Sequence, residues 1–566
     1  MDDSQVCTTV VLNSNIDNYE EFAFADSRIT SITFGNTLTD IVDGMFANCS
    51  MAIEDVLVDG VVSIGDRAFE GNSAEEIVIP DSVENIGVGA FGLMPNLAKI
   101  TSSMTGGSRD AAYDTGAREE AYFAYIFATD DSWLNGGSSF EAKYTTYENG
   151  SVVSTTTYYV ANQIEYVYTG EIIAEYAFSD NEMISRISFE NATTIAEYAF
   201  YDMVGISNAT EGDEIVIPNT VEEIGDYAFA SSDGAIGYRE IDYLIKFEEG
   251  TTPLTLGDYV FINNPILHSI ALPNRTTSIG SSILNGCNQI QSISVPFAGL
   301  TQTATDYEAT IGAYFDTTAS DVNQESLYYM QTSSSQAFYM PTTLTNITIT
   351  GTTIRSEAFA FNRDTTGSFA VSAPNVTTIG EKAFYQNAAL TSFAGGTGIT
   401  SIGNNAFESC TNITSFVANS DINSIGDNAF NNCSNLSTLT LAGARVIGEY
   451  AFANCSSLGS ISSFNASIEE LGQYAFHQAL LETFEIGANL RIVGQYAFLG
   501  CVDSSSNFTT TTISSDAAGT TWDAYNDPSD TTPAASYAVE DFATSATNSS
   551  GLNNYFGSYL VKRQTT

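Results

Sequence analysis

Basic residues are scarce in this sequence. Its 566 residues include 17 Lys and Arg and two His, against 68 Asp and Glu, which gives a formal net charge of −51. Binding to nucleic acid or to an anionic lipid surface depends on Lys and Arg that neutralise phosphates and release counterions. No basic patch is found along the chain, so we expect that nucleic acid is not a partner.

The side chains that most often build catalytic and metal sites do not cluster. The two histidines, His268 and His477, are far apart in the sequence, which argues against a histidine dyad or a histidine metal site. Paired acids such as Glu222–Glu223 look like glycosidase carboxylates, but sequence neighbours in a strand point to opposite faces. We therefore predict that the chain is not an enzyme and has no catalytic, cofactor-binding or metal-binding residues.

Long apolar runs are missing too. A membrane-spanning helix needs roughly 20 consecutive apolar residues, and the longest approach to one, residues 122–128, is much shorter, so we expect no transmembrane segment. The chain begins Met1-Asp2-Asp3, without the basic and apolar regions of a signal peptide. This start is compatible with a processed or recombinant form, with export by another route, or with an intracellular protein.

The acidic residues are spread along the chain and form no long tracts. Hydrophobic residues make up 43% of the sequence and aromatic residues 12%, which is enough apolar surface for an extended core. The carboxylates are then expected on a solvated outer face that keeps a large protein soluble. An alternative is a high-salt or calcium-rich exterior, where screening weakens the repulsion between carboxylates.

The sequence repeats itself every 22 to 24 residues, which is the signature of a solenoid. In the best-preserved run, Ala-Phe pairs recur in steps of 23, 22, 24 and 22 residues, beginning at Ala406, Ala429, Ala451, Ala475 and Ala497. The same unit, or a near equivalent, begins upstream at Ala23, Met45, Ala68, Ala90, Ala177, Ala199, Ala228, Val260, Ile283, Ala358 and Ala383. Together these make sixteen copies.

Each copy follows a simple physical logic. An apolar residue precedes a Gly that permits a tight turn or close backbone approach, and the Ala and Phe that follow can stack on their counterparts in adjacent copies. A later segment, such as Leu436-x-x-Leu439-x-Leu441, ends with the alternation of a half-buried strand. One unit cannot bury its apolar face alone, but stacked neighbours can. The predicted fold is a right-handed, curved solenoid with a parallel β sheet along one face and short turns or helical segments on the other.

The pattern I-G-x-x-A-F-x-x-C followed by L-x-x-I-x-I-P closely resembles the BspA-like (Treponema-type) leucine-rich repeats, over about three quarters of the chain. The resemblance implies a β-rich leucine-rich-repeat solenoid. It also implies an ectodomain of the kind common on bacterial and protist surfaces, often adhesive, and it supplies no catalytic residues.

Two segments interrupt the repeat and divide the chain. The predicted organisation is an N-terminal cap at 1–22, repeat blocks at 23–100, 171–300 and 352–501, β-rich insertions at 101–170 and 301–351, and a C-terminal cap or tail at 502–566. Asn149-Gly150 between two β-rich runs predicts a hairpin. Insertions in solenoids often lie on the binding face, although both could simply cover part of the core. Aromatic residues such as Trp522 favour a folded cap over a flexible tail.

A candidate partner-facing surface combines outward hydroxyl residues of the later strands with tyrosines of the two insertions. These residues are Ser392, Ser415, Thr438, Ser460, Thr483, Tyr144, Tyr147 and Tyr339. Equivalent positions of earlier strands carry charged residues such as Glu76 and Lys99. A flat, uncharged hydroxyl face suits another flat surface or a saccharide, but Ser or Thr is also the ordinary choice at this position of the repeat.

Six of the seven cysteines sit four residues after the Ala of a repeat or its equivalent. We expect them to be small buried core residues, present as free thiols more readily than as disulfides between coils. Acidic residues after the repeat Gly, such as Asp66 and Asp226, suggest a calcium ladder, but Asn404 and Gln473 interrupt it. Calcium is therefore the one cofactor that the sequence leaves open.

Fourteen Asn-x-Ser/Thr sequons occur in the sequence, and they would accept glycans on a eukaryotic secretory route. Several arise simply from the Asn-Cys-Ser turn of the repeat. The candidate N-glycosylation sites are Asn149, Asn191, Asn274, Asn346, Asn465 and Asn507.

These observations favour a secreted or cell-surface recognition or adhesion protein that binds a protein or glycan partner through an extended solenoid surface, with aromatic residues as anchors. The alternative is a structural protein that self-assembles into an extracellular filament or surface coat, since contacts that do not close produce fibres. An exposed, self-complementary cap would favour assembly, and a polar, glycosylated cap would favour adhesion.

Overall fold

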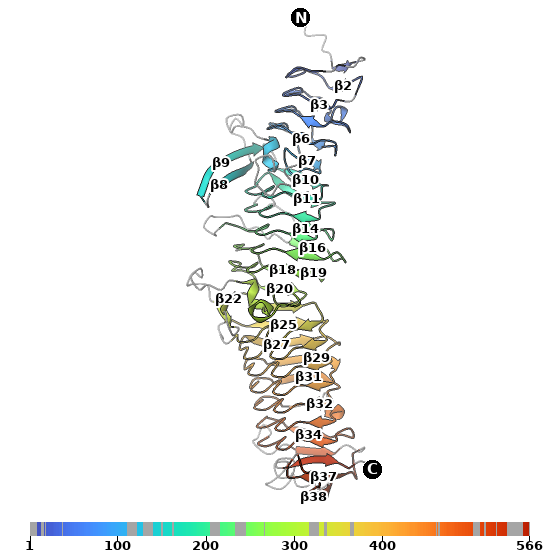
Figure 1. Ribbon diagram of the computed structural model, residues 1–566, viewed down its shortest axis with the longest axis vertical. Coiled ribbons are helices and arrows are strands. Elements are labelled where there is room, and N and C mark those ends of the chain that lie inside the picture. Colours follow the sequence, from blue (N-terminus) through green and yellow to red (C-terminus); the bar gives the residue numbers. More distant parts are fainter. Residues whose placement is uncertain are drawn as a thin grey trace. The chain divides into compact units, whose positions relative to one another are not determined.

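The computed structural model describes residues 8–564 except 13–15, 17, 37, 110–121, 128–139, 149–150, 161–162, 204–214, 233–244, 265–266, 316–327, 333–336, 363–366, 460, 462–464, 502–509, 514–516, 528 and 540–558. In some strands, including those at 140–148 and 151–160, only the backbone is described. The chain divides into two compact units, Met1–Cys287 and Asn288–Thr566. Each unit is a stack of coils (Figure 1).

Most regular coils contribute two strands. A short strand of two or three residues lies at the Ile-Gly motif, and in most coils a longer strand lies at the L-x-x-I-x-I motif, where β-branched residues are frequent. Short strands pair in parallel with short strands of the next coil, and long strands pair with long strands. Each unit therefore contains short-strand sheets and long-strand sheets, and the predicted solenoid of about sixteen turns is confirmed.

In the first unit the short-strand sheets contain β3 (Asp40–Ile41), β4 (Ser63–Ile64) and β6 (Asn85–Ile86), then β11 (Ile172–Ile173), β13 (Thr194–Ile195), β15 (Glu223–Ile224), β17 (Leu254–Leu256) and β19 (Thr276–Ser278). The long strands are β1 (Thr9–Val11), β2 (Ser31–Thr33), β5 (Glu76–Val78), β7 (Lys99–Ser102), β10 (Ile164–Tyr168), β12 (Ile184–Phe189), β14 (Ile215–Ile217), β16 (Ile245–Phe247) and β18 (Ser269–Ala271). A 3-10 turn, η1 (Ile53–Asp55), lies between β3 and β4.

In the second unit the short strands are β24 (Thr353–Ile354), β26 (Thr378–Ile379), β28 (Ser401–Ile402), β30 (Ser424–Ile425), β32 (Val446–Ile447), β33 (Glu470–Leu471) and β35 (Ile492–Val493). The long strands are β20 (Ser292–Val295), β23 (Asn346–Ile349), β25 (Phe369–Ala373), β27 (Leu390–Gly395), β29 (Ser415–Asp421) and β31 (Thr438–Ala442), followed by β34 (Thr483–Ile486), which pairs with β36 (Thr510–Ile513). A 3-10 turn, η9 (Asn465–Ser467), precedes β33.

The core is a column of the repeat phenylalanines. In the second unit the rings of six successive coils stack with centroids 4.8–5.6 Å apart and planes within 10° of parallel, at Phe384, Phe407, Phe430, Phe452, Phe476 and Phe498. The preceding Ala residues are fully buried beside them. The close approach expected at the repeat Gly is also present, because a Cβ on Gly426 would lie 2.6 Å from the backbone nitrogen of Asn404.

Each coil places two residues in the left-handed region of the backbone map. One of them directly precedes the repeat Ala, and Asn405 and Asn428 occupy it with φ near 56°, a conformation that Asn tolerates well. Tyrosine occupies the same position in two runs, Tyr176 to Tyr259 and Tyr450 to Tyr496, at a cost of order 1–3 kcal/mol each. Ring stacking between consecutive coils, for example 4.9 Å between Tyr198 and Tyr227, offsets part of that cost.

The six described cysteines are buried and have free thiols. Each thiol donates a hydrogen bond to the carbonyl of the repeat Phe one coil earlier, as from Cys433 to Phe407 at 3.0 Å and from Cys455 to Phe430 at 3.1 Å. Cysteine therefore satisfies a buried carbonyl between coils. In other coils Asn fills this place, as Asn387 does when its side-chain amide donates to Phe359 at 2.7 Å.

In both insertions a short helical turn takes the place of a coil. In the first, η4 (Phe123–Phe127) lies between regular coils, because Phe91 donates its backbone N–H to Ile126 and Phe123 donates to Ala177. In the second, η8 (Ile311–Tyr314), which follows η7 (Asp306–Ala309), is held in the same way by Ile311 donating to Ala358. β10 pairs with β7 and β12, so the chain returns to the stack through a strand.

Each insertion also contains an antiparallel pair of strands. The hairpin predicted around residues 149–150 is confirmed by the pairing of β8 (Phe140–Glu148) with β9 (Ser151–Val160) (Figure 1). In the second insertion β21 (Tyr328–Thr332) pairs with β22 (Ala337–Pro341).

At the C-terminal end, β39 (Leu560–Arg563) pairs antiparallel with β35 and extends the short-strand sheet. β37 (Thr521–Tyr525) and β38 (Ala535–Ala538) follow it, and the Trp522 side chain is buried beneath them.

Candidate interaction surfaces

The long-strand sheet of the second unit aligns three of the candidate hydroxyl residues. Ser392 pairs with Ser415 and Ser415 pairs with Thr438, in register across β27, β29 and β31. Thr483 lies in β34, whose described partner is β36, and Ser460 is outside the described residues. The structure therefore brings together the first three candidates as one row.

This row continues over six strands. Starting from β20, the residues paired in register are Ser292, Asn346, Ala370, Ser392, Ser415 and Thr438. A second outward row, two residues further along each strand, consists of Ser294, Thr348, Ser372, Ala394, Val417 and Thr440. None of these twelve described residues is charged, and we call the two rows together the neutral face.

Buried residues between the two rows fix the orientation of the neutral face. Phe393 and Phe416 are 1% and 0% exposed, and their rings stack with centroids 4.9 Å apart. Shifting the register by one residue would move these rings to solvent, so the outward direction of Ser392 and Ser415 is strongly specified.

The hydroxyl groups of the neutral face differ in their hydrogen bonding from the hydroxyl groups of the residues just before it. Thr391 and Thr414 donate to carbonyls of the preceding coil at 2.9 and 3.1 Å, so their protons are used within the protein. In the described part of the chain, the hydroxyls of Ser392, Ser415 and Thr438 have no intramolecular partner. These three are therefore available to an external ligand.

The first-row positions are charged in four strands of the first unit. Glu76, Lys99, Glu165 and Arg186 are paired in register across β5, β7, β10 and β12, with alternating sign. Opposite charges facing each other across strands stabilise a sheet. The repeat therefore accepts charged side chains at these positions, and the neutral face of the second unit is a local property.

The tyrosine candidates are only partly described. Tyr339 lies in β22 opposite Met330 and is half-buried between the buried residues Phe338 and Met340. The backbones of Tyr144 and Tyr147 belong to β8, but their side chains are outside the described part of the chain. Their role in binding stays a prediction.

The acidic residues after the repeat Gly have a structural use. The side-chain carboxylate of Asp43 accepts the backbone N–H of Asp66, and that of Asp66 accepts the N–H of Val88, at 2.8 and 2.9 Å. Asn404 does the same for the N–H of Asp427 at 2.9 Å. Because Asn replaces Asp in this role, the column supplies an acceptor oxygen between coils, and calcium binding stays a prediction.

Glutamates at the same position have a different environment. Burial and the nearby charge of Glu197 raise the pKa of Glu175 to about 7, and burial together with Asp226 raises the pKa of Glu197. Both residues line a groove of about 600 Å³ along β11, β13, β15 and β17. Among the described residues, no group of three or more His, Cys, Asp or Glu is placed to hold a metal ion.

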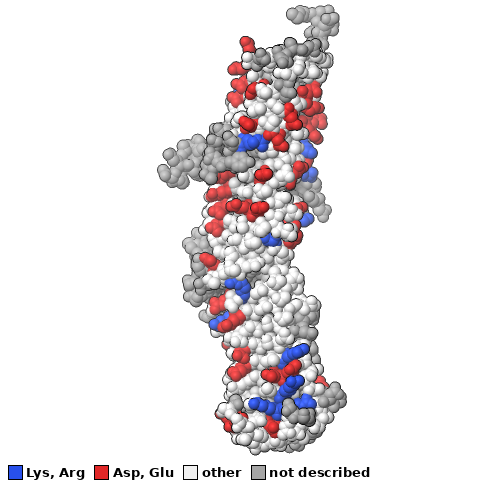
Figure 2. Space-filling view, turned by 45° about the vertical axis from the view of Figure 1, so that its right-hand side comes forward, with Lys and Arg blue, Asp and Glu red and all other residues white. Residues whose placement is uncertain are grey.

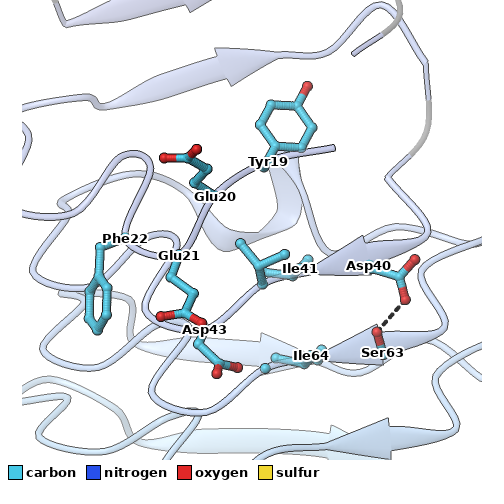
Figure 3. Close-up of a pocket in the computed structure, with 11 residues that line it drawn as sticks. Tyr19, Glu20, Glu21, Phe22, Asp40, Ile41, Asp43, Ser63 and Ile64 are labelled. Atoms are coloured by element: carbon cyan, nitrogen blue, oxygen red, sulfur yellow. Dashed lines mark hydrogen bonds between the residues drawn. The ribbon is translucent and has the colours of Figure 1, made fainter. Parts of the chain in front are cut away.

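A second acidic groove, of about 790 Å³, lies at the N-terminal coils (Figure 3). Glu21, Asp40 and Asp43 line it, and Phe22 beside them is 55% exposed. The hydroxyl of Ser63 donates to Asp40 at 2.5 Å, and this bond, with a second one from Thr39, lowers the pKa of Asp40. This groove, like the other, is lined by residues of the short strands and of the turns that follow them.

The two histidines lie in different units, as their sequence separation suggested. The Nδ1 atom of His477 is 2.9 Å from the carbonyl oxygen of Leu499 in the next coil, and its ring packs against Tyr474. These contacts show that the His477 side chain packs between neighbouring coils of the stack.

Three candidate glycosylation sites use their side chains within the protein. The amide of Asn191 donates to the carbonyl of Thr169, that of Asn274 to the carboxylate of Glu249, and that of Asn346 to the hydroxyl of Thr345. Asn149, Asn507 and the side chain of Asn465 are outside the described residues. Glycosylation of the six sites stays a prediction.

Sequence reasoning missed one charged feature. On the face that Figure 2 shows, Lys and Arg side chains gather toward the C-terminal end, in a chain with 17 Lys and Arg against 68 Asp and Glu. Residues from three separate parts of the sequence form this cluster, Arg445, Arg491, Lys562 and Arg563. No local run of basic residues announces it, because parallel and antiparallel pairing brings the four positions together.

A family model for the BspA type leucine-rich repeat region matches six segments, of which the last five overlap in succession, at 2–103, 159–236, 210–307, 255–388, 331–444 and 377–505. The chain belongs to this family. The resemblance drawn from the repeat is thereby confirmed. Proteins of the BspA type are usually associated with the cell surface and involved in binding, and leucine-rich-repeat proteins are generally not enzymes.

The solved structures that this chain matches include a leucine-rich repeat protein from Bacteroides ovatus (19% identity, TM-score 0.27, covering 64% of this chain and 92% of that one). A leucine-rich cell surface protein from Faecalibacterium prausnitzii has 17% identity and a TM-score of 0.22, with 78% and 89% of the two chains covered. A comparison with curated proteins finds no match. No helix in the described part of this BspA-type chain is long and apolar enough to cross a membrane.

Proposed function

We propose that this BspA-type protein is a secreted or cell-surface recognition protein that binds a protein or glycan partner through the neutral face of its second unit. The contrast between the two units carries the proposal. Four strands of the first unit place charges at the first-row positions that are neutral in six strands of the second, although the whole chain has a net charge of −51. The fold does not require this neutrality, so a binding role is a natural reason for it.

The chemistry of the face favours an uncharged ligand. The free hydroxyls of Ser392, Ser415 and Thr438 can both donate and accept hydrogen bonds, as sugar hydroxyls do. Ala394 and Val417 add small apolar contacts between them. No cationic side chain lies among the twelve described residues of the face to pair with a sulfate, phosphate or carboxylate.

The size of the face favours a narrow ligand. Six strands about 4.8 Å apart span about 24 Å, and two rows of side chains are roughly 10 Å wide. The resulting area of about 250 Å² is well below the roughly 800 Å² per partner of a stable protein interface. A neutral polysaccharide strand fits the face alone, whereas a protein partner needs neighbouring surface, such as that around Tyr339.

The test is a charge placed in the middle of the face. The full chain is screened against neutral and acidic glycans and against extracellular matrix proteins, and the variant Ser415→Glu is compared with Thr101→Glu, which puts the same charge on the long-strand sheet of the first unit. The proposal predicts at least a tenfold loss of affinity for Ser415→Glu and little change for Thr101→Glu. Equal binding by both variants, or binding of acidic ligands alone, would show that the neutral face is not the site.

A further inference from the structure

The basic cluster of Arg445, Arg491, Lys562 and Arg563 stands on adjacent strands at the end of the short-strand sheet in the second unit. Arg445 and Arg491 directly precede β32 and β35. Glu469 precedes β33 between them. On the far side, the backbone N–H of Arg563 in β39 donates to the carbonyl of Arg491 at 2.8 Å. Because neighbouring strands are about 4.8 Å apart, these positions form a ladder along the sheet.

Nearby acids neutralise the cluster only in part. Glu469 lies 4.0 Å from Arg445, and Glu470 is exposed at the start of β33. Asp523 is paired opposite Lys562, but its carboxylate accepts hydrogen bonds from Ser536 and Gln564.

The two arginines nearest the cap have no acidic partner of their own in the described part of the chain. The guanidinium of Arg563 donates to the carbonyl of Ala488, and the side chain of Arg491 is exposed. A positive edge therefore remains on a chain that contains 17 basic and 68 acidic residues.

The complementary surface is on the first unit. There the residues that precede or begin the short strands include Glu171, Glu222 and Glu223, and the turns after them carry Glu175 and Asp226. This acidic side has the same strand spacing as the part of the basic cluster that carries Arg445 and Arg491, since both belong to parallel short-strand sheets of one repeat.

We propose that the basic cluster binds the acidic short-strand side of the first unit of a second copy. The contact goes beyond the recognition role proposed above and does not depend on it. It joins different surfaces of the two copies, so it leaves a free basic cluster at one end and a free acidic side at the other, and copies can add in an open series. The matched ladders let several cation–carboxylate pairs form at once, which a polyanion without this spacing would not achieve.

The strength of the contact follows from its exposure. Each exposed ion pair stabilises a contact only weakly and is screened by salt. A few such pairs give a weak association, which is strongest at low ionic strength. It is lost when the Debye length falls to about 3 Å near 1 M salt.

The experiment measures the mass of the full chain by light scattering and analytical ultracentrifugation over a range of protein concentrations at low and high salt. The test variant is Arg445→Glu with Arg491→Glu. The matched control is Arg67→Glu with Lys382→Glu, which are basic residues elsewhere on the surface. Each replacement lowers the net charge by two, so both double variants carry −55 instead of −51 and differ only in where the charge lies.

The proposal predicts salt-sensitive oligomers for the wild type and the control, and at least a tenfold weaker association constant for the test variant. Mixing the test variant with a Glu222→Arg, Glu223→Arg variant should restore association between the two. Circular dichroism checks that each variant is folded, and Arg445→Gln with Arg491→Gln replaces the test variant if it is not. A wild type that stays monomeric at low salt, an equal effect of test and control variants, or binding of heparin without self-association would each overturn the proposal.

Discussion

Replacing Phe430 with Ala tests whether the phenylalanine column holds adjacent coils together. Phe430 is 0% exposed, and its ring stacks between Phe407 at 5.0 Å and Phe452 at 5.2 Å. A third ring, Phe416 of the long-strand sheet, meets it edge-on at 5.1 Å. The substitution therefore removes three aromatic contacts and leaves a cavity between three coils.

The expected cost is large and local. Deleting a buried Phe side chain costs about 3–5 kcal/mol, and this site lies at the upper end because each lost aromatic pair adds about 0.5–1.5 kcal/mol. In a solenoid each coil contacts only its neighbours. The loss should therefore be concentrated in the coils of Phe407, Phe430 and Phe452, and the first unit should keep its stability.

Hydrogen exchange measured by mass spectrometry gives the free energy of local opening for each coil. Phe430→Ala should lower it by about 3–5 kcal/mol in residues 401–455, with little change in residues 63–100. Phe430→Leu, which retains most of the volume, is the control and should lose far less. A loss below about 1 kcal/mol for Phe430→Ala, or an equal loss along the whole chain, would refute the nearest-neighbour account of the stack.

Three further outcomes are expected. Asp427→Ala removes the acceptor for the backbone N–H of Glu449, now at 2.8 Å, and should lower the free energy of unfolding by about 1 kcal/mol. Asp427→Asn should retain this hydrogen bond, as Asn404 does in its own coil. Equal losses of stability for the two variants in chemical denaturation would contradict this role. The pKa of Glu175 is about 7 in the folded protein against 4.5 ordinarily. The native state therefore holds this proton more tightly, and the free energy of unfolding should fall as pH rises from about 4.5 to 7. Glu175→Gln should flatten this pH dependence of the unfolding midpoint, and an unchanged slope would exclude Glu175 as its source. Burial raises the pKa of the Cys433 and Cys455 thiols, the latter to about 12. A thiol reagent should therefore label them at pH 8 only after denaturation. Rapid labelling of the native protein would show that these coils open in the native state.

Most of the fold could be predicted because the repeat encodes it locally. The spacing of Ile, Gly, Ala, Phe and Cys reports which side chains stack, and the structure places all five types where the period requires, as at Ile425, Gly426, Ala429, Phe430 and Cys433. The sequence did not predict that a short helical turn takes the place of a coil in each insertion. That substitution depends on backbone hydrogen bonds between residues far apart in the chain, such as Phe123 and Ala177.

The candidate surfaces were predictable only where one position of the repeat recurs at a constant spacing. Ser392, Ser415 and Thr438 share one such position, so their alignment follows from the period. The basic cluster does not, because Lys562 and Arg563 come from a cap strand that returns antiparallel beside β35. The structural role of the acidic column could not be predicted either, because Asp66 accepts a backbone N–H from Val88 in the next coil and the sequence period does not specify that contact.

A hydrogen-exchange footprint of the full chain with the ligand identified by the binding screen tests the central claim most directly. Recognition through the neutral face predicts protection of β27, β29 and β31, residues 390–442, with no change in β5 and β7 at residues 76–102. Protection confined to the first unit or to the acidic grooves, with residues 390–442 unchanged, would contradict it.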